Sequence, residues 1–145
     1  MSEVIVGVDG SPGSDLAVDL GTDLARALES PLRIVHAYVP WSAQYPFNIA
    51  GVDAGTQQLE VTQQAAGEGV LQDAARRARE RGGIDAVTEL VAANPAEALI
   101  ERSGRARLLV IGSRGLGSIK GLLLGSVSQR CVQLARCPVT VVPQG

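Results

Sequence analysis

The stretch VIGSRGLGSIKGLLLGSVS, residues 110–128, takes the chain from an apolar run through a glycine-rich loop into a helical pattern. The apolar residues 108–111 are typical of a buried strand. Five glycines follow, namely Gly112, Gly115, Gly117, Gly121 and Gly125. The first amides of a helix have no partner within the helix, and the helix dipole favours negative charge there. The stretch therefore predicts an anion-binding loop between a strand and a helix that begins at Ser126.

Strand-like and helix-like segments alternate along the rest of the chain. Short apolar or β-branched runs predict strands at residues 4–8, 32–39, 86–91, 108–111 and 138–142. Helical periodicity and capping residues predict helices at residues 12–29, 56–81, 95–103 and 126–135. This alternation is typical of an α/β fold with a parallel sheet and right-handed crossovers. The strand order stays open between 2-1-3-4-5 and an order in which the first and fourth strands are neighbours.

The middle of the chain is harder to interpret. Residues 40–55 hold the only Trp and Phe, and we expect a long loop that covers a site or a partner surface. In the helix expected at residues 56–81, Gly67 and Gly69 each cost about 1 kcal/mol relative to alanine. The apolar residues expected on the packed side of this helix are Leu59, Ala66, Val70, Ala74 and Ala78. The arginines within residues 76–81 are expected on its solvated face.

Length, composition and charge limit the class of protein. A chain of 145 residues fits one domain, residues 1–145, and 46% hydrophobic with 19% charged residues is typical of a globular protein. A net charge of −2 argues against a general nucleic-acid binder. No apolar run reaches the roughly 20 residues of a membrane span, and MSEVIVGVDG does not resemble a signal peptide. We therefore expect a cytoplasmic protein without a membrane segment or a nucleic-acid partner.

The spacing of the glycines distinguishes between nucleotide-binding loops. A P-loop requires lysine directly after its last glycine, but Ser118 follows Gly117. A dinucleotide fingerprint follows the first strand and ends in glycine, but this loop follows the fourth strand and has Lys120 at that position. A third pattern is glycine, two residues, glycine, nine residues, glycine and then serine or threonine. The chain meets it at every position, with Gly112, Gly115, Gly125 and Ser126.

This third pattern is the nucleotide-loop motif of the universal stress protein family, which the chain resembles from end to end. Residues 4–18, 33–40 and 137–142 (VIVGVDGSPGSDLAV, RIVHAYVP and CPVTVV) are similar to the family's first, second and last strands. The resemblance implies an open five-stranded parallel sheet of order 3-2-1-4-5 with helices on both faces, as in adenine nucleotide alpha hydrolase-like proteins. It also implies binding of ATP or another adenine nucleotide with Mg²⁺, and a homodimer formed through the strand from Pro138 to Val142.

The resemblance also assigns roles by position. Asp9 matches an acidic residue near the nucleotide and its Mg²⁺, and Ala37 matches a residue whose backbone borders the adenine. Gly112 and Gly115 match residues beside the ribose and phosphates. The residues that match the phosphate-binding helix start are Gly125, Ser126, Val127 and Ser128. Glycine allows a ligand to approach the backbone closely, which agrees with these roles. The alternative for Asp9 is a cap of the first helix, and the alternative for the loop is a tight connection without a ligand.

Other residues also have a structural interpretation beside a functional one. Lys120 and Arg114 would either pair with a phosphate or be solvated. We expect His36 to be a satisfied residue at a strand end, with a pH-sensitive contact to the adenine as the alternative. We expect Cys131 to be a small core residue, and redox sensing by Cys137 is the less favoured interpretation of that residue.

The sequence suggests no catalytic constellation. The single His has no evident Ser or Cys partner, and no pair of carboxylates has a spacing suited to acid–base chemistry. The first hypothesis is a nucleotide-binding regulatory protein of the stress response. The second is an interaction module with an empty loop, in which the dimer edge and residues 40–55 carry the function. The third is a weak ATPase, since slow hydrolysis needs little more than Mg²⁺ and an ordered water.

Overall fold

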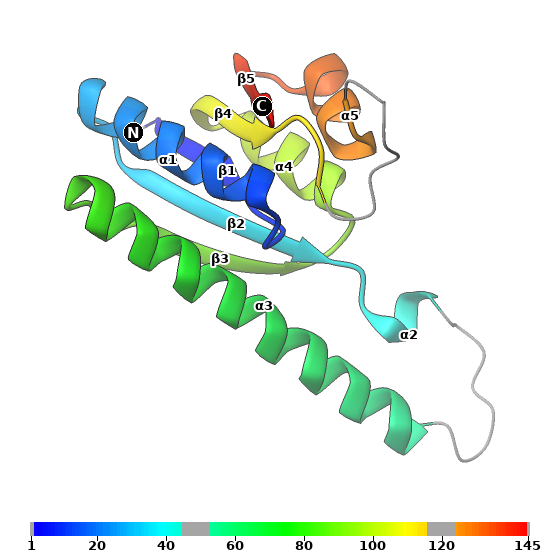
Figure 1. Ribbon diagram of the computed structural model, residues 1–145. Helices are drawn as coiled ribbons and strands as arrows, with labels where there is room; N and C mark the ends of the chain where they lie inside the picture. Colours follow the sequence, from blue (N-terminus) through cyan, green and yellow to red (C-terminus); the bar gives the residue numbers. More distant parts are fainter. Residues whose placement is uncertain (1, 45–52, 116–123, 145) are drawn as a thin grey trace.

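The computed structural model describes residues 2–44, 53–115 and 124–144, and within them the chain alternates between strands and helices (Figure 1). The strands are β1 (Glu3–Gly7), β2 (Leu32–Tyr38), β3 (Val87–Ala92), β4 (Ala106–Gly112) and β5 (Val139–Val142). The helices are α1 (Pro12–Ala27), α2 (Trp41–Gln44), α3 (Asp53–Gly82), α4 (Pro95–Ser103) and α5 (Ser126–Leu134). Residues 116–123 of the predicted loop, which include Gly117, Ser118, Lys120 and Gly121, lie outside the described residues.

The strands form one parallel sheet of order β3-β2-β1-β4-β5. This order confirms the predicted fold and decides the question that the alternation of elements left open. β1 and β4 are neighbours, and Val6 pairs with Val110. The carboxyl ends of these two strands therefore lie side by side, and each strand leads into a loop with predicted site residues.

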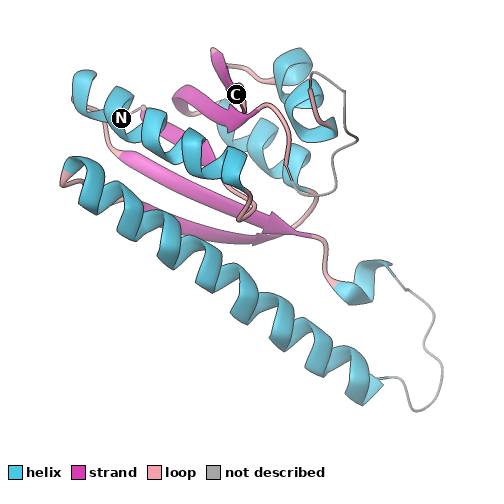
Figure 2. Ribbon diagram, in the orientation of Figure 1, coloured by secondary structure: helices cyan, strands magenta, loops and turns pink. Residues whose placement is uncertain are grey.

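Helices cover both faces of the sheet (Figure 2). Successive side chains of a strand point to opposite faces, so Val4 and Val6 of β1 pack in one core cluster and Ile5 packs in the other. The first cluster receives apolar residues of α1 and α3, such as Val18 and Leu71. The second cluster receives residues of α4 and α5. The sheet is thus buried on both sides, and its carboxyl edge is left for a site.

The segment between β2 and β3 differs from the prediction. Residues 40–55 are not simply a loop, because they contain α2 and the first residues of α3. α3 runs past the end of the sheet (Figure 1), and Leu59 near its first end is exposed rather than packed. Ala66 is also exposed, although the next residue, Gly67, packs against Leu90 of β3, so Ala66 lies on the outer side of the helix. Gln63 of α3 instead makes polar contacts with the chain that enters α2, because its amide Nε2 donates to the Val39 carbonyl at 3.1 Å. Although α3 has 30 residues, neither it nor any other helix of the described ranges is apolar enough to cross a membrane.

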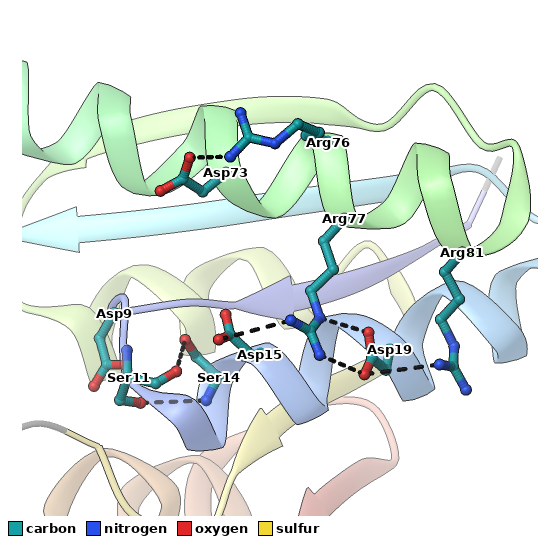
Figure 3. A network of polar contacts seen from close by, with 9 residues as sticks. All are labelled: Asp9, Ser11, Ser14, Asp15, Asp19, Asp73, Arg76, Arg77 and Arg81. Carbon is teal, nitrogen blue, oxygen red and sulfur yellow. Dashed lines mark hydrogen bonds and ion pairs between the residues drawn. The ribbon is translucent and has the colours of Figure 1, made fainter.

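Ion pairs align α1 and α3 (Figure 3). Arg77 donates to both carboxylate oxygens of Asp19, at 2.7 and 2.9 Å. Arg81 donates to Asp23 at 2.9 Å, and this hydrogen bond lowers the pKa of the Asp23 carboxyl. The arginines are partly exposed, as predicted, but these two also join neighbouring helices. Exposed pairs of this kind contribute little stability individually, so their main effect is to favour one alignment of the helices.

Candidate functional site

A cavity of about 270 Å³ lies at the carboxyl edge of the sheet, where the ends of β1 and β4 meet. Parallel α/β sheets bind ligands at this edge, at the point where the strand order reverses. The eight predicted site residues all line the cavity: Asp9, Ala37, Gly112, Gly115, Gly125, Ser126, Val127 and Ser128. The structure thus brings together residues from four separate parts of the sequence. Their contacts with a nucleotide stay a prediction.

One wall of the cavity is apolar. Val35 and Ile111 contribute from β2 and β4, and Leu99 contributes from α4. All three side chains are nearly completely buried. The sequence analysis missed Leu99 and its neighbour in the wall, Pro95. The available signal was the start of a helix directly after the third strand, since crossover helices in a parallel sheet begin at its carboxyl edge.

The turn between β1 and α1 supplies the acidic group of the cavity. One carboxylate oxygen of Asp9, Oδ1, accepts a hydrogen bond from the Ser11 amide at 2.9 Å. Ser11 itself is the N-cap, because its hydroxyl accepts from the Ser14 amide at 3.2 Å (Figure 3). The alternative of Asp9 as the helix cap is therefore wrong. Asp9 orders the turn before the cap, and its side chain lines the cavity.

The start of α5 forms a polar part of the cavity lining. Gly125 is the N-cap with extended backbone, and no side chain of the described residues caps the helix through a hydrogen bond. The Ser113 carbonyl accepts hydrogen bonds from the Gly125 amide at 2.6 Å and from the Ser128 hydroxyl at 2.8 Å. These two contacts fix the helix start against the end of β4. The Ser128 hydroxyl is buried within the protein, whereas Ser126 is exposed.

Charge in the cavity is sparse. Among the described lining residues, Asp9 and Arg114 are the ionisable ones, and they carry opposite charges. No three His, Cys, Asp or Glu side chains of the described ranges gather closely enough to hold a metal ion by themselves. A metal ion in this cavity would therefore need oxygen ligands from a bound molecule in addition to Asp9.

The contacts and burial of the remaining candidate residues indicate structural roles. The ring nitrogen Nδ1 of His36 lies 2.8 Å from the Val8 carbonyl, which confirms a satisfied residue at the strand end. Cys131 is completely buried, and burial raises the pKa of its thiol to about 11, so it is a core residue as predicted. Burial also raises the pKa of Cys137. Redox chemistry requires the thiolate, and a raised pKa makes this form scarcer at neutral pH.

Comparison with known proteins gives a consistent result. The model of the universal stress protein family matches residues 1–143. Universal stress protein Rv2623 of Mycobacterium tuberculosis is 40% identical over 140 residues, which make up 95% of this chain and 44% of that protein. The chain thus spans about half the length of this relative. Universal stress protein YxiE of Bacillus subtilis is 30% identical, and the alignment covers 97% of this chain and 98% of YxiE.

A solved structure extends the similarity to three dimensions. A crystal structure of a universal stress protein in complex with cAMP is 32% identical in sequence, with a TM-score of 0.70. The match covers 99% of this chain and 98% of the other. The sheet order, the spacing of the loop glycines and the match over residues 1–143 agree. The chain belongs to the universal stress protein family.

Proposed function

We propose that this protein binds an adenine nucleotide in the cavity at the carboxyl edge of the sheet and acts as a regulatory protein of the stress response. The observation that carries the proposal is the composition of the cavity. Apolar residues suited to a base and a helix start suited to phosphates line one space of about 270 Å³. The cAMP complex of a protein that is 32% identical over nearly the whole chain supports the same ligand class.

The proposed orientation follows from the two sides of the cavity. The base lies against Val35, Ala37 and Leu99, where burial of its faces is favourable. The phosphates lie at the amides of Ser126 and Val127, where the helix dipole favours negative charge.

We further propose ATP with Mg²⁺ as the bound form. Asp9 would hold the metal together with phosphate oxygens, since Mg²⁺ in nucleotide sites is commonly bound by one or two carboxylates and the phosphates. Bound Mg²⁺ would neutralise charge on the phosphates. The structure fits this role in one respect, because the Asp9 carboxylate lines the same cavity as the start of α5.

The proposed homodimer uses β5, the last strand of the sheet. The carbonyls of Pro138 and Val142 accept from the amides of Leu109 and Ser113, so these residues turn their backbone groups toward β4. Backbone groups of successive residues in a strand point to opposite sides, so the amide of Val141 faces the outer edge. An edge strand with unpaired amides is suited to pairing with a second copy. The single domain and the cytoplasmic location stay predictions.

Titration calorimetry with Mg-ATP, AMP and cAMP tests the nucleotide proposal. Ser126→Asp places a carboxylate at the helix start, and we expect at least about a tenfold loss of affinity for each nucleotide because like charges repel there. Gly125→Ala should also weaken binding, because it adds a side chain where phosphate approaches. Gln129→Asp is the matched control, since Gln129 is an exposed residue of the same helix outside the cavity lining.

Both aspartate variants favour the helix through its dipole, so a loss confined to Ser126→Asp reports on the ligand rather than on folding. The two variants should differ little in their affinity for adenosine, which has no phosphate. Absence of binding heat with all three nucleotides in the wild-type protein would reject the proposal and favour the nucleotide-independent interaction module.

A further inference from the structure

Two of the motif glycines have close neighbours within the protein. A Cβ atom built on Gly112 would lie 3.0 Å from the carbonyl carbon and oxygen of Gly13, in the first turn of α1. In the reverse direction, a Cβ atom on Gly13 would lie 2.8 Å from the Arg114 carbonyl oxygen. Real side chains rarely approach backbone atoms so closely. The start of α1 and the end of β4 therefore pack backbone against backbone, which is possible only without side chains at these positions.

Gly115 has a comparable relation to Asp9. A Cβ atom on Gly115 would overlap the carboxylate oxygen Oδ2 of Asp9 and lie 3.2 Å from its Cγ. The other oxygen of the same carboxylate accepts from the Ser11 amide at 2.9 Å. The Asp9 carboxylate is thus confined between the Ser11 amide on one side and the backbone of Gly115 on the other.

Backbone conformation does not explain these two glycines. The described glycines with positive φ are Gly10 and Gly83, at 84° and 66°. Gly112 and Gly115 are outside this group, so their φ angles are open to residues with side chains. At Gly112 a side chain would meet the backbone of Gly13, and at Gly115 it would displace the Asp9 carboxylate, so in both cases the obstacle is steric and belongs to the protein itself.

We infer that Gly112 and Gly115 are positioning residues that seat the start of α1 and thereby fix the Asp9 carboxylate at the cavity. In this arrangement the first half of the glycine motif is shaped by contacts within the chain. The second half, Gly125 and Ser126, forms the helix start that is proposed to hold the phosphates. The effect of Gly115 on affinity rests on the nucleotide binding proposed above, whereas its contact with Asp9 does not.

A double-mutant cycle tests this inference, with Asp9→Ala, Gly115→Ala and the combined variant beside the wild type. In the presence of Asp9, the new methyl group must push the carboxylate aside and break its hydrogen bond with the Ser11 amide. We expect Gly115→Ala to reduce Mg-ATP affinity by about tenfold in calorimetry, because the displaced Asp9 carboxylate no longer reaches the Mg²⁺ that it is proposed to hold. In the Asp9→Ala background the space is open, and Gly115→Ala should change the affinity by less than about twofold.

Two measurements on the nucleotide-free protein complete the cycle. Gly115→Ala should accelerate amide hydrogen exchange at Ser11 and lower the thermal midpoint when Asp9 is present. Neither change should follow when Asp9 is already alanine. Gly69→Ala is the control for the glycine-to-alanine change itself, because a Cβ atom on Gly69 meets nothing within 4 Å.

Each outcome decides a different point. Equal losses of Mg-ATP affinity in both Asp9 backgrounds would overturn the inference and show that the nucleotide itself requires the glycine. Failure of the wild type to bind Mg-ATP would count against the proposed function. In that case the exchange rates and thermal midpoints still decide the inference, and equal shifts in both backgrounds would overturn it.

Discussion

Replacing Ser128 by alanine tests whether the start of α5 is fixed before any ligand arrives. Ser128 is 3% exposed, and its hydroxyl donates to the Ser113 carbonyl at 2.8 Å. Ser113 also donates its amide to the Val142 carbonyl at 2.9 Å, so this one residue joins β4, β5 and α5. Ser128→Ala removes one of these links and leaves the backbone of the helix start otherwise unchanged.

The size of the effect follows from what remains after the change. The lost hydrogen bond contributes about 1 kcal/mol to the free energy of unfolding. The Ser113 carbonyl keeps the Gly125 amide as a donor at 2.6 Å, so no buried acceptor is left unpaired. Alanine is a better helix former than serine, which offsets about 0.5 kcal/mol. The net loss is therefore about 0.5 kcal/mol, or roughly 1–2 °C in the thermal midpoint for a chain of this size.

Differential scanning calorimetry and amide hydrogen exchange at Gly125, both without nucleotide, measure the effect. Exchange at Gly125 should accelerate in Ser128→Ala, because the partner of its amide is held less firmly. Ser126→Ala is the matched control, since Ser126 is exposed one position after the cap. That control should leave the exchange rate at Gly125 unchanged and should not lower the midpoint, because alanine also favours the helix there. An unchanged midpoint and exchange rate in Ser128→Ala would refute the role of its hydroxyl in fixing the helix.

Three further expectations rest on other parts of the structure. A Cβ atom on Gly67 would lie 2.6 Å from a Leu90 methyl group, so Gly67→Ala should be less stable than Gly69→Ala by about 2 kcal/mol in urea unfolding. The hydrogen bond from the Arg102 guanidinium lowers the pKa of Glu89 in the folded protein. The pair therefore stabilises the protein fully above the ordinary glutamate pKa, and this stabilisation is lost as the pH falls through the lowered pKa. Between pH 7 and pH 3, the free energy of unfolding of Glu89→Gln should therefore fall by about 1 kcal/mol less than that of the wild type. Val141→Pro removes an outward amide of β5 and should shift sedimentation toward monomer, whereas an unchanged dimer would place the interface elsewhere.

The sequence predicted the helices and strands because the signals that mark them lie within a few neighbouring residues. Ser11 followed by Pro12, and Asn94 followed by Pro95, predicted helix starts, and both caps have the expected hydrogen bonds to amides three residues later. The 30-residue α3 was predicted three residues short at its first end, since no capping signal marks that point. Its first turns were predicted to pack but are exposed, because the periodicity of a helix does not show how far the sheet beneath it extends.

The candidate site was found mainly through the spacing of the glycines after the fourth strand. Spacing along a chain is preserved in the fold when one loop carries the residues, as with Gly112, Gly115 and Gly125. The position of Asp9 after the first strand marked it as a candidate, and its role beside a nucleotide came from the resemblance to a family. Asp9 lies far along the chain from the loop, and its place beside it depends on which strands are neighbours. Leu99 was not predicted, because its place in the cavity wall depends on how α4 packs against the sheet.

The sequence by itself determined the alternation of strands and helices and the glycine loop, because hydrophobic period, turn residues and motif spacing act over short distances. Only the tertiary structure decided the roles of residues of the same type. Gly67 is packed and Gly69 open, Ser128 is internal and Ser126 exposed, and Gly115 lies against Asp9. These differences arise from contacts between segments that strand order brings together, and residue type alone does not encode them.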